Sequence, residues 1–172
     1  MENSDSIINA VIPELEFFKK GKVRDMYQLG KNKLLMVTTD RVSCFDRVLN
    51  EPIPLKGDVL AGIAEFWFNK SKGIVRNHII SMPDPCVFIL KKCAPIQVEF
   101  VVRDYMAGSL WRDYATGKRE KCGVKLPEGL SENMKLPQPI ITPTTKADHD
   151  KDATPAELID KGLLTHALWK KI

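Results

Sequence analysis

The segment FVVRDYMAGSLW, residues 100–111, constrains the fold more than any other part of the chain. An apolar run rich in branched residues predicts a buried strand that ends at Arg103. A glycine break follows at Gly108, and the residues from Ser109 onward indicate a helix. Backbone N–H groups and arginine donors converge at such junctions, where phosphates and carboxylates bind. The segment therefore predicts an anion-binding junction that contains Arg103 and Ser109.

Arg103 also has a structural interpretation. A guanidinium at the end of a buried strand is costly unless it is paired. Its partner is then either an anionic ligand or an internal carboxylate, and Glu99 and Asp104 are the candidates nearest in sequence. The residues alone leave both interpretations open.

Composition excludes several classes of protein. The chain has 172 residues, 44% of them hydrophobic, which is enough for a core of one domain's size. No apolar run approaches the roughly 18 residues of a membrane span, and the N-terminus lacks the features of a secretory signal. The 4 cysteines show no C-x-x-C spacing, so we expect reduced thiols. We therefore expect a soluble, cytoplasmic protein with no membrane partner.

The net charge of +4 is mild. Proteins that bind nucleic acid through its phosphates usually carry a denser stripe of Lys and Arg than this chain shows. Small anionic ligands account equally well for the scattered basic residues, and we expect no nucleic-acid partner.

Hydrophobic patterns predict an α+β fold. Two strands joined by a turn are expected over residues 21–39, with further strands at 86–90 and 96–102. Apolar residues recur at helical spacing over residues 57–72, which predicts an amphipathic helix. The aromatic cluster at residues 66–68 of this helix is expected to belong to the core.

The last third of the chain predicts a loop followed by a helix. Five of the 11 prolines lie in residues 127–155, which favours a long extended loop over regular structure. A capping box begins at Thr154, with Pro155 at the first helical position. One face of the helix that follows carries Ile159, Leu163 and Ala167, so a single closing helix is expected.

Three further segments carry residues suited to binding phosphate or substrate. Residues 19–27 combine a glycine with basic residues on a predicted hairpin, and they match neither a P-loop nor a dinucleotide-binding pattern. Residues 38–48 place two carboxylates around an arginine, and residues 139–152 hold Lys146 beside acidic residues that could bind Mg²⁺. A solvated surface explains each segment equally well when it is taken alone.

Seven segments in order across the chain together resemble the phosphoribosylaminoimidazole-succinocarboxamide synthase, or SAICAR synthetase, family of purine biosynthesis. The matching segments are GKVRDMY (21–27), TTDRVSCFD (38–46), PIPLKG (52–57), EFWF (65–68), VRNH (75–78), VEFVVRDYMAGSLW (98–111) and PIITPTTKADHD (139–150). Each string is weak alone, but their shared order is specific to the family.

The resemblance implies an α+β fold with an ATP-grasp-like, kinase-related antiparallel sheet and packed helices. Residues 1–94 would form a nucleotide-binding lobe, and residues 95–172 would form the start of a second lobe that carries substrate-binding residues. The implied reaction joins carboxyaminoimidazole ribonucleotide to L-aspartate at the expense of ATP, through an acyl phosphate. Mg²⁺ would assist both the formation of the acyl phosphate and the attack of aspartate on it. The alternative is a noncatalytic fragment that binds nucleotide or ribonucleotide.

The resemblance also implies roles for individual residues. Arg103 and Ser109 would hold the ribonucleotide, and Lys146 would lie near the nucleotide, so that Lys146 and Arg103 are the expected catalytic residues. The residues expected to bind ATP are Gly21, Lys22, Arg24, Lys91 and Lys146. The loop residues expected near the substrates are Asp40, Arg41, Ser43 and Asp46.

Length is the main departure from the family. Family members run well beyond 200 residues, and two acidic segments of their second half, D-x-K-x-E-F-G and D-E-x-x-T-P-D-S-S-R, are not found in this sequence. The family's metal ligands lie there, so we expect no metal ligand in this chain. A complementing C-terminal chain or a homo-oligomer would be the corresponding protein partner.

Overall fold

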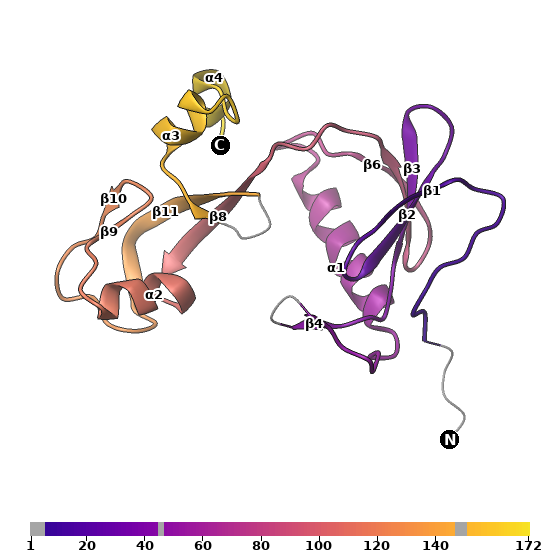
Figure 1. Cartoon of the computed structure of the whole chain (residues 1–172), viewed down its shortest axis with the longest axis horizontal. Helices are drawn as coiled ribbons and strands as arrows, with labels where there is room; N and C mark the ends of the chain where they lie inside the picture. The colour runs from indigo at the N-terminus through magenta and orange to yellow at the C-terminus, as the bar shows by residue number, and fades with distance from the viewer. Residues whose placement is uncertain (1–5, 45–46, 147–150) are drawn as a thin grey trace. The chain divides into compact units, whose positions relative to one another are not determined.

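The computed structural model describes residues 6–44, 47–146 and 151–172. The chain divides into two compact units, Met1–Cys93 and Ala94–Ile172, which we call unit 1 and unit 2 and describe separately (Figure 1). The observed boundary lies one residue before the predicted boundary between residues 94 and 95. Both units combine antiparallel sheets with helices, so the predicted α+β class is confirmed.

Unit 1 is built on an antiparallel sheet of 5 strands in the order β1-β2-β3-β7-β6. Its strands are β1 (Phe17–Lys20), β2 (Arg24–Gln28), β3 (Lys33–Thr38), β6 (Ile79–Asp84) and β7 (Val87–Lys91). The predicted turn between β2 and β3 forms where Gly30 adopts a φ of 64°, a conformation that glycine enters without strain. Two further short strands, β4 (Ser43–Cys44) and β5 (Arg47–Val48), pair with each other.

Helix α1 (Lys56–Ser71) contacts the sheet through small residues. Gly57 and Ala61 are its buried positions, and Ala61 joins a core cluster with Leu34, Phe88 and Leu90 of the sheet. The prediction that residues 66–68 belong to the core is wrong for Phe66 and Trp67, which are 53% and 64% exposed. The helix meets the sheet on its glycine and alanine side, so these larger side chains lie elsewhere on the helix.

Unit 2 contains an antiparallel sheet of 3 strands in the order β12-β11-β8. Its strands are β8 (Val98–Tyr105), β11 (Lys135–Thr145) and β12 (Lys151–Asp152), and a separate hairpin pairs β9 (Glu120–Lys121) with β10 (Val124–Lys125). Helix α2 (Gly108–Ala115) follows β8 directly, so the predicted strand-to-helix junction is present.

The prediction of a long loop over residues 127–155 is wrong, because β11 occupies 11 of these residues. Proline lacks the N–H that a strand donates to its neighbour, which made a strand improbable from sequence. Pairing of β11 with β8 is irregular between Lys135 and Ile140, and Pro137 and Pro139 lie within this interval. Two prolines are thus accommodated where the ladder is already interrupted.

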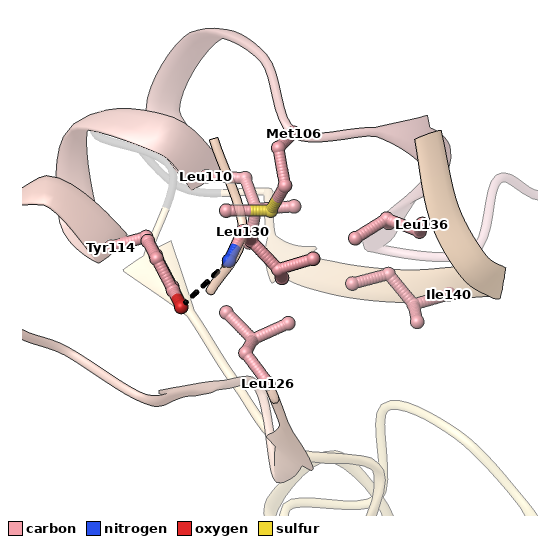
Figure 2. Close-up of a cluster of buried hydrophobic side chains, with 7 residues drawn as sticks. All are labelled: Met106, Leu110, Tyr114, Leu126, Leu130, Leu136 and Ile140. Carbon is pink, nitrogen blue, oxygen red and sulfur yellow. Dashed lines mark hydrogen bonds between the residues drawn. The ribbon is translucent and has the colours of Figure 1, made fainter. Parts of the chain in front are cut away.

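One of two buried clusters in the described part of unit 2 fixes α2 (Figure 2). Its members are Met106, Leu110, Tyr114, Leu126, Leu130, Leu136 and Ile140. The hydroxyl of Tyr114 donates to the carbonyl of Pro127 at 2.8 Å and accepts from the backbone N–H of Leu130 at 3.2 Å. The buried hydroxyl of Tyr114 therefore has hydrogen-bond partners inside the core.

The capping box at Thr154 is confirmed, but the predicted closing helix is two helices, α3 (Pro155–Asp160) and α4 (His166–Trp169). Gly162, with a φ of 69°, ends α3. The N–H of Gly162 bonds to the carbonyl of Ile159, and that of Leu163 bonds to the carbonyl of Leu158, which is the Schellman arrangement. The apolar spacing continued past this glycine, and so the sequence pattern concealed the break.

None of the helices in the described part of the chain is long and apolar enough to cross a membrane.

Gly57 is the position in unit 1 where a methyl group would do most damage. A Cβ at Gly57 would lie 2.4 Å from the carbonyl oxygen of Thr38, so α1 would have to move away from the sheet. We expect Gly57→Ala to destabilise the chain by about 1–3 kcal/mol in urea unfolding.

Gly62 provides the matched control in the same helix. A Cβ there meets nothing within 4 Å, so Gly62→Ala should stabilise the chain by roughly 0.5–1 kcal/mol through helix propensity alone. Equal effects of the two substitutions would show that α1 does not depend on close contact at Gly57.

Candidate functional site

A buried ion pair organises the candidate site in unit 1. Arg41 follows β3, and its Nη2 and Nη1 atoms contact Oδ1 and Oδ2 of Asp25 on β2 at 2.8 and 3.0 Å. The two side chains are only 5% and 3% exposed. Burial acts to raise the pKa of Asp25, but hydrogen bonds from Arg41 and from the N–H of Ala10 outweigh it, so this pKa lies below its ordinary value.

The same guanidinium holds the turn between β1 and β2. Its Nε donates to the carbonyl of Lys22 and its Nη2 to the carbonyl of Gly21, each at 3.0 Å. The next carbonyl, that of Val23, accepts from both the N–H and the hydroxyl of Thr39 at 3.0 Å. Three consecutive carbonyl groups of the turn are therefore bound from within the protein, which fixes its backbone.

Arg41 also ties the segment before β1 into this arrangement. Its Nη1 donates to the carbonyl of Ile8 at 2.5 Å. Lys20 reaches the same segment, because its Nζ donates to the side-chain oxygen of Asn9 at 2.6 Å. The segment before β1 and the turn thereby become two walls of one cavity.

The cavity has a volume of about 620 Å³ and a basic lining. It is lined by Ile8, Asn9, Lys20, Gly21, Lys22, Arg41, Val48, Leu49, Asn50 and Pro52. Of the residues predicted to bind ATP or substrate, Gly21, Lys22 and Arg41 are thus brought together. Two lysine ammonium groups and two amides of this lining can neutralise and hydrogen-bond a phosphorylated ligand, whereas the charge of Arg41 is already paired with Asp25.

Arg24 lies apart from these residues. It lines a smaller cavity of about 150 Å³ beneath α1, together with His78 and mainly apolar side chains. Successive side chains of a strand point to opposite faces, so Arg24 lies on the side opposite Asp25. Burial and the charge of Arg24 lower the pKa of His78, which favours its neutral form. The role of Arg24 in ATP binding stays a prediction.

Asp40 is buried, and both of its carboxylate oxygens have backbone partners. Oδ2 accepts from the N–H of Ile7 at 2.9 Å, and Oδ1 accepts from the N–H of Gly57 at 2.8 Å. These contacts join the segment before β1 to the start of α1. In this conformation Asp40 and Arg41 shape the site through protein contacts, and the prediction that they bind substrate directly stays untested.

The remaining predicted residues of unit 1 are dispersed. Ser43 is half-buried on β4, and Lys91 is exposed at the end of β7. Asp46 lies outside the described residues. Their predicted roles therefore rest on the sequence alone.

In unit 2 the structure brings Arg103 and Ser109 together. Nη2 of Arg103, on β8, donates to the hydroxyl of Ser109 at the start of α2 at 3.1 Å. Its Nε donates to the hydroxyl of Thr142 on β11 at 2.9 Å, and Thr142 in turn donates to the carbonyl of Val101 at 3.3 Å. Two hydroxyl groups therefore orient the half-buried guanidinium.

Thr142 was not predicted from the sequence as a partner of Arg103. Its pairing with Val101 across β11 and β8 places it beside Arg103. This pairing was not expected, because the sequence predicted a loop where β11 forms. The only signal in the sequence was a threonine among the prolines of residues 139–145.

The charge of Arg103 has no internal partner in the described part of the chain. Neither Glu99 nor Asp104 forms an ion pair with it, and Glu99 instead contacts Lys146, with 2.7 Å between Oε1 and Nζ. Hydroxyl groups accept hydrogen bonds but supply no compensating charge. Of the two interpretations of Arg103 from sequence, the geometry favours an anionic ligand over an internal carboxylate.

The fold and these two sites define an α+β protein with a basic cavity in unit 1 and an arginine–hydroxyl cluster in unit 2. Residues 17–172 match the family model described as SAICAR synthetase. The chain therefore belongs to the SAICAR synthetase family.

Individual relatives agree with this assignment. The chain is 50% identical over 155 residues to the phosphoribosylaminoimidazole-succinocarboxamide synthase of Legionella pneumophila (strain Lens), covering 87% of this chain and 49% of that protein. It is 45% identical over 174 residues to the chloroplastic synthase of Vigna aconitifolia, covering 98% and 50%. The chain thus spans about half the length of these curated relatives.

A solved structure gives the same result. The SAICAR synthase of Saccharomyces cerevisiae, in complex with SAICAR, superposes with a TM-score of 0.86 at 31% identity. The match covers 96% of this chain and 61% of the yeast chain.

The pairing of Arg41 with Asp25 should show strong energetic coupling. Arg41→Met leaves a buried carboxylate unpaired, and we expect a loss of about 3–5 kcal/mol in the free energy of unfolding. Asp25→Asn combined with Arg41→Met should lose less than Arg41→Met alone, because no uncompensated charge remains.

Two comparisons control this experiment. Arg76→Met removes an exposed arginine of unit 1 and should change stability by less than about 0.5 kcal/mol. Because the pKa of Asp25 is lowered, its charge stabilises the fold above its ordinary pKa of 3.8, and this contribution is lost as pH falls below that value. Additive effects of the two substitutions would contradict the coupling.

Proposed function

We propose that the chain takes part in an ATP-dependent ligation that joins the carboxylate of carboxyaminoimidazole ribonucleotide to the amine of L-aspartate. The products are SAICAR, ADP and phosphate. A carboxylate oxygen attacks the γ-phosphorus of ATP and releases ADP, and the amine nitrogen then attacks the acyl carbon and releases phosphate. Membership of the SAICAR synthetase family supports this reaction.

The observation that carries the proposal is the state of Arg103. Its guanidinium is oriented by two hydroxyl groups and lacks a carboxylate partner among the described residues. Such a group is ready to bind the phosphate or carboxylate of a ribonucleotide without first breaking an ion pair. The yeast relative, solved with SAICAR, binds a molecule of this class. We assign Arg103 and Ser109 to ribonucleotide binding, and Arg103 also to stabilising negative charge in the reaction.

We assign the basic cavity of unit 1 to ATP, in a lobe that we propose to be ATP-grasp-like and kinase-related. Gly21 and Lys22 lie on the fixed turn, where backbone and ammonium can approach phosphate oxygens. Lys146 would stabilise the transferred phosphoryl group. Its side chain is exposed, and its ion pair among the described residues is with the half-exposed Glu99, so an anionic ligand can compete for it.

Mg²⁺ would neutralise phosphate charge in this reaction. No group of three or more His, Cys, Asp or Glu side chains that could hold a metal ion occurs in residues 6–44, 47–146 and 151–172. The described residues therefore do not form a metal site, and the acidic residues 148 and 150, which the sequence suggested for Mg²⁺, lie outside them.

A second candidate function is noncatalytic binding of the nucleotide or ribonucleotide. It is compatible with the partial match, in which the chain spans about half of its curated relatives. Ribonucleotide binding requires Arg103 and Ser109 in both candidates, and only the ligase requires turnover.

Turnover on the chain as it stands separates the two. The chain would be incubated with ATP, Mg²⁺, carboxyaminoimidazole ribonucleotide and L-aspartate, and SAICAR and ADP would be measured by mass spectrometry. Formation of SAICAR that Lys146→Met abolishes supports the ligase. SAICAR binding in calorimetry without turnover supports the second candidate, and the absence of both binding and turnover contradicts each of them.

Arg103→Ala should weaken SAICAR binding far more than it affects folding. Loss of charge-assisted hydrogen bonds predicts a Kd about 10- to 100-fold higher by calorimetry. Arg112→Ala removes the same charge from an exposed position of α2 and should leave the Kd within about twofold. A large fall in melting temperature with unchanged affinity would show that Arg103 is a structural residue.

A further inference from the structure

Lys121 is an unusually placed lysine on the β9–β10 hairpin of unit 2. Its side chain is only 7% exposed. Lysine is almost never buried to this extent unless its charge is paired. No motif in the sequence singled it out, because it is one of several basic residues at 118–125, and nothing in the sequence marks it as the buried one.

The hairpin turn that follows Lys121 packs against the rest of unit 2. Cys122 and Gly123 form a turn of two residues with φ values of 52° and 84°, the conformation of a tight hairpin turn. The Sγ of Cys122 contacts the carbonyl of Pro143 at 3.5 Å, and a Cβ on Gly123 would lie 3.4 Å from Cγ2 of Thr154. The turn is therefore held between β11 and the start of α3.

The ammonium of Lys121 joins two elements that the backbone does not connect. Its Nζ contacts Oδ2 of Asp113 on α2 at 2.6 Å, and it also contacts Oδ2 of Asp152 on β12. Burial acts to lower the pKa of Lys121, but the bonds to both carboxylates outweigh it and raise this pKa. Hydrogen bonds from Lys118 and Lys121 lower the pKa of Asp113 to about 2. Lys121 and Asp113 are therefore both charged at neutral pH.

Asp113 and Asp152 both lie on elements next to residues of the candidate site. Asp113 lies four residues after Ser109, one turn along the same helix. Asp152 pairs with Thr144 on β11, and Lys146 is the residue that follows the end of β11 at Thr145. One ammonium thus connects the helix that carries Ser109 with the strand pair that precedes Lys146.

We propose that Lys121 is a positioning residue for the ribonucleotide site, an inference that rests on the proposed function. Its ammonium fixes α2, which carries Ser109, relative to the β11–β12 pair, which carries Thr142 and directly precedes Lys146 at the end of β11. Arg103 is bonded to both elements, through Ser109 and Thr142. Without the ammonium, two carboxylates would face each other and repel, and the spacing of these residues would widen.

Lys118 offers a matched control. It contacts Oδ1 of the same Asp113 at 2.7 Å, but its side chain is 62% exposed, and among the described residues it forms no ion pair with Asp152. Lys118→Met therefore removes the same type of charge from the same carboxylate and leaves the connection between α2 and β12 intact.

The test is calorimetric titration of the full chain with SAICAR. Lys121→Met should raise the Kd about tenfold or more, Lys118→Met should leave it within about twofold, and Lys121→Arg should restore most of the affinity, because a guanidinium can bridge two carboxylates. If Lys121→Met fails to fold, Asp152→Asn replaces it, since that variant keeps the Lys121–Asp113 pair. Unchanged affinity in the folded variants overturns the proposal.

Hydrogen exchange distinguishes failure of the positioning role from failure of the proposed function. If the native chain does not bind SAICAR, the proposed function fails. The positioning role is then judged on amide exchange in residues 108–113 and 142–146. Faster exchange in both segments of Lys121→Met, but not of Lys118→Met, supports it, and exchange changes confined to residues 120–125 overturn it.

Discussion

The buried pair of Arg41 and Asp25 is the interaction on which unit 1 depends. One guanidinium binds a carboxylate on β2, two carbonyls of the β1–β2 turn and a carbonyl of the segment before β1. A buried charge is tolerated only when its partners satisfy it, so these segments cannot separate without a large free-energy cost. The basic cavity exists because the turn and the preceding segment are held around this one side chain.

Much of the fold could be predicted from the sequence, because local patterns report local structure. The β2–β3 turn, the strand that leads to Arg103 and the capping box at Thr154 all follow from short-range signals. The predictions that were wrong concern features that tertiary contacts decide. Pro137 and Pro139 are accommodated by irregular pairing with β8, and Phe66 and Trp67 are exposed because α1 meets the sheet through smaller residues.

The candidate site was predictable in part. Arg103 and Ser109 share one segment, so their proximity could be inferred from six residues of sequence. Thr142 and Lys121 could not be found, because each depends on pairing between distant segments. Sequence also could not separate two arginines of similar appearance. Arg41 is bound by protein groups throughout, whereas Arg103 is oriented by hydroxyls and keeps its charge for a ligand.

The contrast between these two arginines is the central claim, and the side-chain Nε–H signals test it directly. The chain labelled with ¹⁵N would be titrated with SAICAR, with Arg103→Lys and Arg41→Lys used to assign the two signals. The signal of Arg103 is expected to shift in a saturable manner, together with the backbone amide of Ser109, while that of Arg41 stays in place. A shift confined to Arg41, or no shift of Arg103 at saturating SAICAR, would contradict the account.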